Sequence, residues 1–249
     1  MTSDTTFRPD LYTGKVVLVV GGTTGIGAGI AAAFANLGAV VTVTGATRAE
    51  CATARAAVDF GGRDAIALDV RDEAAVAHVI DNLPRLDVLV NCAGVIRRGA
   101  EHDVRVFEEV LAINLTGTMR TCSLAREKLK RARGAIVNTA SVLSFFGGGL
   151  VPGYASSKGG VVQLTKSLAI AYAPDNIRVN ALAPGWVATP LTQALQDDAA
   201  RSAAILARTP LGRWAQPDDI AGAAVFLCSP AARFITGIVM PVDGGYLIT

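Results

Sequence analysis

The chain has 249 residues, 51% of them hydrophobic and 18% charged, which is enough apolar material for a sizeable core. The net charge is +2 and the basic residues are scattered, so the sequence does not favour a nucleic-acid partner. No apolar run approaches the roughly 18 residues that a membrane-spanning helix needs, so the sequence does not favour a membrane partner either. Only two histidines and four well-separated cysteines are present, which argues against a metal site and favours a reduced, cytoplasmic setting.

An apolar run, a glycine-rich turn and an alanine-rich segment follow one another near the N-terminus. Residues 15–20 contain five consecutive apolar residues, typical of a strand buried on both faces of a parallel sheet. Residues 21–27 then lead into a predicted helix over 28–37, an order that aims backbone amides at a phosphate. The spacing is G-x-x-x-G-x-G, with Ile30 where the common G-x-G-x-x-G pattern needs its third glycine, so this turn alone also allows a plain tight turn.

The alternation of strands and helices continues to the end of the chain. We expect further strands at 40–44, 64–68, 88–90, 134–139, 178–183 and 239–242. We expect helices at 48–58, 73–82, 107–133, 154–172 and 218–227, with helix and loop over 189–213. This pattern predicts an α/β, Rossmann-type doubly wound parallel sheet of about seven strands, with helices on both faces and ligands at the carboxyl ends of the strands. Without repeats or linkers, residues 1–249 should form a single domain, with a loosely ordered tail at 1–11.

Two polar features stand on predicted helix faces. Asn114 interrupts the apolar stripe of the helix expected over 107–133, so its amide must be satisfied either as structure or as part of a functional relay. Tyr154 and Lys158 are four residues apart and share one helical face, which allows an ammonium to sit beside a phenol. Acid/base work near neutrality needs a tyrosine pKa lowered by roughly 3 units from about 10. Such a pair also occurs by chance on helix surfaces.

Together the motifs resemble the short-chain dehydrogenase/reductase family over about residues 12–248. They are the turn at 21–27, Asn91-Cys92-Ala93-Gly94, Asn114, Ser141 with Tyr154-x-x-x-Lys158, and Pro184-Gly185. The resemblance implies an NAD or NADP cofactor and hydride transfer between an alcohol and a carbonyl. One departure is Val20, where the family usually has a threonine that holds the glycine turn by hydrogen bonding.

The resemblance also implies roles for individual residues. Tyr154 would be the acid/base, Lys158 would depress its pKa and hold the nicotinamide ribose, and Ser141 would bond the substrate oxygen. Asn114 would hold a water in a proton relay with Lys158. The cofactor-binding set would be Gly21, Thr24, Gly25, Ile26, Gly27, Gly45, Arg48, Asp69, Val70, Asn91, Ala93, Gly94, Tyr154, Lys158, Pro184, Gly185, Val187 and Thr189.

For two residues of this set, a purely structural role is as good an explanation as cofactor binding. Asn91 can instead tie its strand to a neighbour, and Thr189 can instead cap a helix that begins at Pro190. The cofactor form also stays open. Gly45 stands where an acid would select NAD, while the nearby Arg48 could receive the phosphate of NADP or simply open a helix.

Within the family, the segment Ile96-Arg97-Arg98 and the loop after Ser141 resemble bacterial sugar-acid dehydrogenases of the 2-deoxygluconate 3-dehydrogenase and ketodeoxygluconate type, which commonly use NAD. The small-molecule substrate would then be a sugar acid or related polyol, with its carboxylate clamped by Arg97, Arg98 or Arg208. Substrate contacts would come from Arg97, Ser141, Leu143, Ser144, Tyr154 and Trp186.

Two other functions stay open. A reductase of 3-oxoacyl thioesters or other ketones would share the same core motifs. A non-catalytic cofactor-binding protein is disfavoured, because it would have no need for the whole set of Asn114, Ser141, Tyr154 and Lys158. The long helices and the apolar segment 235–248 resemble surfaces that form tetramers in the family, so we expect a homotetramer, although these apolar residues could equally belong to the monomer core.

Overall fold

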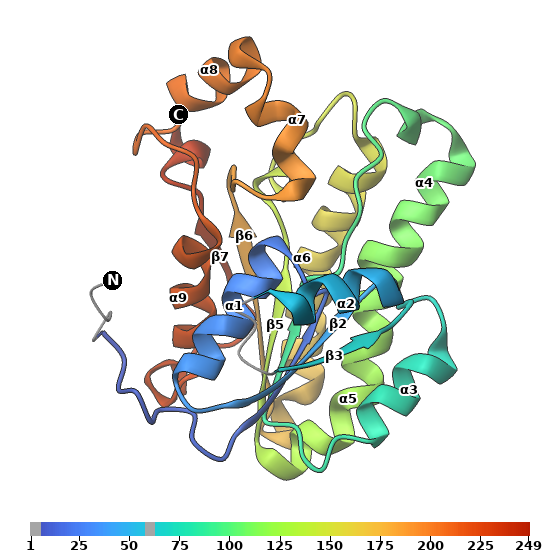
Figure 1. The fold of residues 1–249 in the computed structure, drawn as a ribbon, viewed down its shortest axis with the longest axis vertical. Coiled ribbons are helices and arrows are strands. Elements are labelled where there is room, and N and C mark those ends of the chain that lie inside the picture. Colours follow the sequence, from blue (N-terminus) through green and yellow to red (C-terminus); the bar gives the residue numbers. More distant parts are fainter. Residues whose placement is uncertain (1–5, 58–62) are drawn as a thin grey trace.

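The computed structural model describes residues 6–57 and 63–249, and within them one parallel sheet forms the centre of the fold (Figure 1). Its strands are β1 (Val16–Val20), β2 (Val40–Gly45), β3 (Asp64–Ala67), β4 (Val88–Asn91), β5 (Ala135–Thr139), β6 (Arg178–Pro184) and β7 (Val239–Val242). Their order is β3-β2-β1-β4-β5-β6-β7, and all neighbouring pairs are parallel. The predicted Rossmann-type α/β fold is confirmed.

Helices connect the strands nearly where the sequence pattern predicts them. They are α1 (Gly25–Asn36), α2 (Arg48–Ala56), α3 (Glu73–Asp81), α4 (Val104–Leu111), α5 (Gly117–Ala132), α6 (Pro152–Tyr172), α7 (Gln193–Gln196), α8 (Ala199–Ala207) and α9 (Pro217–Cys228). Short single turns include η2 (Ala100–His102), η4 (Val142–Ser144) and η6 (Pro190–Thr192). The helix predicted over 107–133 is interrupted, because the π-helical turn η3 (Ala112–Thr116) separates α4 from α5. A π turn of this kind often marks a functional position, and this one contains Asn114.

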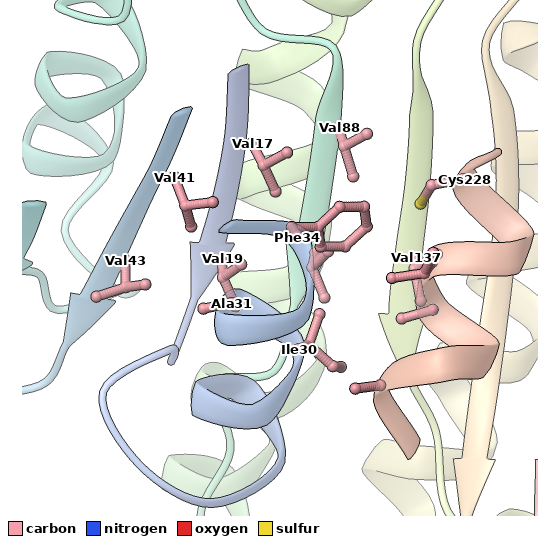
Figure 2. Packing of buried hydrophobic residues seen from close by; sticks show 14 of the residues in the cluster. Val17, Val19, Ile30, Ala31, Phe34, Val41, Val43, Val88, Val137 and Cys228 are labelled. Carbon is pink, nitrogen blue, oxygen red and sulfur yellow. The ribbon is translucent and has the colours of Figure 1, made fainter. Parts of the chain in front are cut away.

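Alternating residues of the strands face two separate cores. Val17 and Val19 of β1 pack with Phe34 of α1 and with residues of α2 and α9, while Leu18 packs on the other face with residues of α3, α5 and α6. Figure 2 shows the first core, where Phe34 lies between the valines of the strands and α9. Burial of each such side chain contributes roughly 1.5–3 kcal/mol. The run of four valines and one leucine in β1 is therefore apolar because both faces of the strand are covered.

The N-terminal segment is joined to this first core. Phe7 and Leu11 pack against it, and the buried hydroxyl of Tyr12 donates to the carbonyl of Val225 in α9 at 2.7 Å. Residues 1–5 of the predicted tail, and residue 58 of the helix predicted over 48–58, lie outside the described residues. Across the part of the chain that the structure describes, no helix is both long and apolar enough to cross a membrane.

The register of the sheet brings the ends of its central strands together. Val20 of β1 lies beside Asn91 of β4, which lies beside Asn138 of β5. The glycine turn, the segment after β4 and the segment after β5 consequently emerge at one edge of the sheet. This is the edge where open α/β sheets bind ligands.

Candidate active site

A pocket of about 260 Å³ lies at the carboxyl ends of β1, β4 and β5. Its lining comes from the glycine turn, the segment after β4, the start of α6 and the loop after β6. The lining residues are Gly21, Thr24, Gly25, Ile26, Gly27, Cys92, Gly94, Thr139, Tyr154, Lys158, Thr189, Pro190 and Leu191. The fold thus gathers into one cavity residues that the sequence separates by more than a hundred positions.

The glycine turn leaves room for a diphosphate. Gly21 has φ +78°, and a Cβ placed there would lie 2.5 Å from the backbone nitrogen of Ala93. α1 begins at Gly25, and the Thr24 side chain makes no capping hydrogen bond to the first turn. The backbone amides at the start of α1 are therefore open toward the pocket, which is the arrangement that binds a dinucleotide's phosphates.

Thr44 replaces the threonine that the sequence analysis found missing at Val20. Its hydroxyl, from the neighbouring strand β2, accepts a hydrogen bond from the amide of Gly21 at 3.2 Å, and its carbonyl accepts one from Gly22 at 2.9 Å. The glycine turn is therefore held by hydrogen bonds despite Val20. The sequence contained no local signal for this contact, because it depends on the pairing of β1 with β2.

Tyr154 and Lys158 meet at the start of α6. The Nζ of Lys158 lies 5.6 Å from the centre of the Tyr154 ring and donates to the carbonyl of Thr139 at 2.6 Å. Only 4% of Lys158 is exposed, and this burial lowers the pKa of its ammonium to about 8. The lysine is therefore mostly protonated at pH 7.

The expected lowering of the Tyr154 pKa is not what the structure shows. Burial of the phenol raises the pKa of Tyr154, and the hydrogen bond with Ser141 acts in the opposite direction. The reason is geometric: Lys158 lies over the ring and gives its hydrogen bond to Thr139. The protein alone therefore holds Tyr154 as a protonated acid at neutral pH.

Ser141 has a hydroxyl proton to offer. The residue caps η4, where its Oγ accepts the amide of Leu143 at 3.2 Å, and its own amide donates to the Oγ of Ser144 at 3.1 Å. Ser141 is 7% exposed. A hydroxyl that accepts one backbone amide still donates one hydrogen bond, and the hydrogen bond of Ser141 with Tyr154 places that donor where a reacting oxygen beside the phenol would lie.

Asn114 holds the segment after β4 against α6. Its side chain is fully buried; Oδ1 accepts the amide of Val95 at 2.8 Å, while Nδ2 donates to the carbonyl of Val95 at 3.0 Å and to the Oγ of Ser157 at 3.1 Å. A Cβ on Gly94 would lie 3.4 Å from Oδ1 of Asn114 and 3.6 Å from Nζ of Lys158. The asparagine thus supports the pocket wall and stands beside the lysine.

Comparisons with known proteins now decide the family. A family profile described as Enoyl-(Acyl carrier protein) reductase matches residues 20–247. The 2-dehydro-3-deoxy-D-gluconate 5-dehydrogenase of Bacillus subtilis is 43% identical over 243 residues, which cover 94% of this chain and 95% of that protein. The chain belongs to the short-chain dehydrogenase/reductase family. It is an NAD(P)-dependent oxidoreductase, as its motifs predicted.

Solved structures agree with this assignment. A putative 2-deoxy-D-gluconate 3-dehydrogenase from Agrobacterium tumefaciens, with bound NADP, is 40% identical, has a TM-score of 0.87 and covers 98% of this chain and 100% of its own. A gluconate 5-dehydrogenase from Burkholderia cenocepacia, in complex with NADP and tartrate, is 33% identical, has a TM-score of 0.88 and covers 97% of this chain and 98% of its own. The predicted resemblance to sugar-acid dehydrogenases of the family is confirmed.

The strand β2 ends at Gly45, as predicted, but an acid from α2 lies beside this position in the short-chain dehydrogenase/reductase. Glu50, in the first turn of α2, turns its carboxylate back to accept the amide of Ala46 at 2.9 Å and the hydroxyl of Thr23. A Cβ on Gly45 would lie 3.1 Å from the Glu50 carboxyl carbon, so the absence of a side chain at Gly45 gives the glutamate its place. A negative charge consequently sits near the position that separates NAD from NADP.

The other predicted cofactor residues occupy several environments. Asp69 is exposed and forms a bidentate ion pair with Arg71, which lowers the pKa of Asp69, while Val70 is buried next to it. Thr189 caps η6 and also lies 3.1 Å from the place of a Cβ on Gly25, so it is both a cap and a pocket wall. Pro184 ends β6 and Gly185 follows it, Val187 is buried, and Arg48 is exposed at the start of α2.

Asn91 has the structural role that the sequence analysis weighed against cofactor contact. Its Nδ2 donates to Oδ1 of Asn138 at 2.9 Å, and its Oδ1 accepts the hydroxyl of Thr121 at 2.7 Å. Asn138 in turn donates to Thr165 at 3.0 Å. This buried network joins β4, β5, α5 and α6 beneath the pocket. Sequence reasoning missed Asn138, Thr121 and Thr165, because the sequence does not show with which residue a buried polar side chain forms a hydrogen bond.

Of the predicted substrate residues, Tyr154 lines the pocket, and the others lie on segments outside its lining. Arg97 is exposed and pairs with Glu109 at 3.1 Å, and Leu143 and Ser144 belong to η4. Trp186 packs edge-on against Trp214 and Tyr246, and its buried indole nitrogen has no hydrogen-bond partner within the described chain. Arg208, another candidate for the carboxylate, lies 4.2 Å above the Tyr246 ring. The role of the C-terminal Tyr246 was missed, because only the fold brings it to Trp186.

Proposed function

We propose that this enzyme interconverts a secondary alcohol and a ketone in a sugar acid or related polyol, with Tyr154 as the acid/base. The proposal is carried by Tyr154 and Lys158, which line one pocket, and by the hydrogen bond that joins Ser141 to Tyr154. Ser141 would donate to the substrate oxygen, and Tyr154 would give or take the proton there. Lys158 would hold the nicotinamide ribose and place a positive charge beside the phenol. The bound nicotinamide supplies the hydride acceptor or donor.

The substrate class rests on the relatives and on two arginines. The relatives named above act, by their names, on gluconate derivatives. Arg97 and Arg98 follow the pocket segment that Asn114 holds at Val95. Arg97 pairs with Glu109, whereas the exposed Arg98 forms no ion pair within the residues that the structure describes. Arg98 is therefore the cation most available to a substrate carboxylate, with Arg97 beside it.

The proposal is tested by turnover of a matched pair, D-gluconate and its neutral counterpart D-glucitol, with each of the two cofactors. The panel also contains 2-dehydro-3-deoxy-D-gluconate, 5-keto-D-gluconate, simple hydrophobic ketones and acetoacetyl-coenzyme A. We expect turnover of one or more sugar acids, followed by nicotinamide absorbance. Turnover of hydrophobic ketones with none of the sugar acids would contradict the substrate class, and preference for the thioester would favour the 3-oxoacyl reductase alternative.

The Arg98→Ala variant sharpens this test. Loss of a charged hydrogen bond to a carboxylate should raise KM for the preferred sugar acid roughly 10- to 100-fold. The KM for D-glucitol, or for any neutral polyol that is turned over, should change less than threefold. Equal effects on charged and neutral substrates would show that Arg98 does not bind the carboxylate.

We also infer a homotetramer. Its support is the exposure of large apolar side chains on the elements expected to form interfaces, namely Met119 in α5, Ile170 in α6 and Ile248 near the C-terminus. Ile170 is 78% exposed, and a subunit interface on α6 would remove this apolar surface from water. Light scattering in solution distinguishes a tetramer from a monomer or dimer.

A cytoplasmic location is the accompanying proposal. It is supported by the free thiols of Cys51, Cys92, Cys122 and Cys228, of which three are buried. Fractionation of the producing cells, with the enzyme detected by its turnover, tests this location. Recovery in the periplasmic or extracellular fraction would contradict it.

A further inference from the structure

Glu101 is a buried carboxylate bound by two backbone amides from distant parts of the chain. It is 1% exposed and lies in η2, between β4 and α4. One carboxylate oxygen accepts the amide of Arg97 at 2.7 Å, and the other accepts the amide of Tyr154, also at 2.7 Å. Both distances are those of short, charge-assisted hydrogen bonds. One side chain therefore joins the segment carrying the two arginines to the residue proposed as the acid/base.

The surroundings of Glu101 differ from those of the other buried acids. Among the described residues, Asp87 pairs with Lys15 and Arg85, and Asp175 pairs with Arg126 and Lys130. Glu101 forms no ion pair within that same part of the chain. Burial of a carboxylate without a cation is costly, so the two amides must provide its compensation.

The amide of Tyr154 is one of the first in α6, where no helical carbonyl can accept it. The residue preceding the helix, Val151, has no side chain able to cap it. Glu101 provides this cap from 53 residues away. A Cβ on Gly153 would lie 3.3 Å from the Glu101 carboxylate, so the glycine permits the close approach.

Two exposed contacts extend the same junction. The amide of Gly99 donates to the carbonyl of Leu150 at 2.7 Å, and the ring of His102 lies 2.9 Å from the carbonyl oxygen of Gly149. The segment 97–102 is thus seated along 149–154. Glu101 is the buried part of this junction and its only direct link to Tyr154 among the described residues.

We propose that Glu101 is a positioning residue that sets the acid/base Tyr154 relative to the substrate-binding segment carrying Arg97 and Arg98. This inference rests on the proposed function, since it needs Tyr154 to be the acid/base. Glu101 does not touch the reacting atoms. It acts by fixing the first turn of α6 and, through its charge, by disfavouring the phenolate.

The charge effect provides a readout that a purely structural role would not move. The charged groups near the phenol are Lys158 on its own helix and Glu101 on η2, and the thiol of Cys92 after β4 lies near Lys158. Burial raises the pKa of Tyr154 most, the Ser141 hydrogen bond lowers it, and the Glu101 charge raises it further. Removal of this negative charge should therefore lower the pKa of Tyr154.

Two substitutions separate position from charge. Glu101→Gln keeps the size, removes the charge and turns an NH₂ group toward one of the two donor amides. Glu101→Asp keeps the charge, but its shorter side chain cannot reach both amides. Glu108→Gln makes the same chemical change at an exposed carboxylate of α4 and serves as the matched control.

Turnover is measured with the fastest sugar acid of the panel. Ionisation of Tyr154 is measured as the difference in phenolate absorbance between each variant and the same variant that also carries Tyr154→Phe. The chain has only four tyrosines, so this difference is measurable without substrate. We expect Glu101→Gln to lower kcat about 10- to 100-fold and the Tyr154 midpoint by about half a pH unit or more. Glu101→Asp should lower kcat without lowering the midpoint, and Glu108→Gln should change neither. Thermal melting verifies that each variant is folded.

An unchanged kcat and an unchanged midpoint in Glu101→Gln would overturn the inference. A fall in kcat together with an equal loss of cofactor affinity would also overturn it, since that indicates general damage to the pocket. If Glu101→Gln fails to fold, the test rests on Glu101→Asp. Wild-type turnover in folded Glu101→Asp would contradict the positioning role. If Tyr154→Phe itself keeps turnover, the proposed function fails, while the absorbance titration still reports whether Glu101 acts on Tyr154.

Discussion

Gly21 offers a test of how the glycine turn is built. In Gly21→Ala the new Cβ would lie 2.5 Å from the nitrogen and 2.6 Å from the Cα of Ala93, at a backbone φ of +78°. Gly14 has nearly the same backbone, with φ +74°, but a Cβ there would have no atom within 4 Å. Gly14→Ala is therefore a matched control that carries the conformational cost without the steric one.

The expected magnitudes follow from these two geometries. A left-handed conformation costs a residue other than glycine about 1–2 kcal/mol, and both variants carry this cost. The clash with Ala93 involves backbone on both sides and cannot be relieved by a rotamer change, so overpacking adds about 1–3 kcal/mol in Gly21→Ala alone. We expect a loss of about 2–5 kcal/mol for Gly21→Ala and about 1–2 kcal/mol for Gly14→Ala.

The assay combines urea unfolding with a fluorescence titration of NADPH. The turn lines the pocket, as do Cys92 and Gly94 on either side of Ala93. A shift of this backbone should therefore weaken NADPH binding at least about tenfold in Gly21→Ala, whereas Gly14→Ala should leave it unchanged. Equal losses of stability and unchanged NADPH affinity in both variants would refute the view that the turn closes against the segment after β4.

Three further predictions concern a buried charge, an acid near the cofactor and a buried hydroxyl. Lys158→Met should abolish turnover yet raise the free energy of unfolding at pH 7 by about 2 kcal/mol. The gain arises because the Lys158 pKa falls from 10.5 to about 8 on folding, and the loss of the hydrogen bond to Thr139 offsets part of it. Burial of the Lys158 ammonium destabilises the fold below pH 8, and this cost fades as the pH rises toward 10.5. The higher melting temperature of the variant should therefore vanish at high pH, and a difference in melting temperature that does not depend on pH would contradict this. Glu50→Gln should shift the ratio of kcat/KM values toward NADP by about tenfold or more, because it removes a negative charge near the end of β2, and an unchanged ratio would place the 2′-phosphate elsewhere. Tyr12→Phe should cost about 1–2 kcal/mol in urea unfolding with no change in NADPH affinity, because it leaves the buried Val225 carbonyl without its donor.

The strands were predictable because most of them are rich in apolar residues and are bounded by polar or glycine residues. The closeness of Tyr154 and Lys158 followed from a four-residue spacing that any helix converts into proximity. The contacts that support the site were not predictable in this way. Thr44 reaches Gly21 across 23 residues and Glu101 reaches Tyr154 across 53, and such pairs depend on which strands and turns become neighbours.

Glu50 shows a different limit of sequence reasoning. The position where an acid would select NAD is the end of β2, which is Gly45, whereas the acid stands in the first turn of α2 and folds back. The π turn at Asn114 was hidden for a related reason. Its apolar stripe is compatible with a regular helix, and only packing against Val95 and Ser157 shifts the register.

The most direct test of the proposed chemistry is the Tyr154→Phe variant, which removes one oxygen atom from a partly buried side chain. Turnover of the preferred sugar acid and binding of NADPH are measured on the same preparation. The assignment of Tyr154 as the acid/base predicts a fall in kcat of roughly 10²- to 10⁴-fold, with the NADPH dissociation constant within about twofold of wild type. A variant that keeps a tenth or more of the wild-type kcat would contradict it.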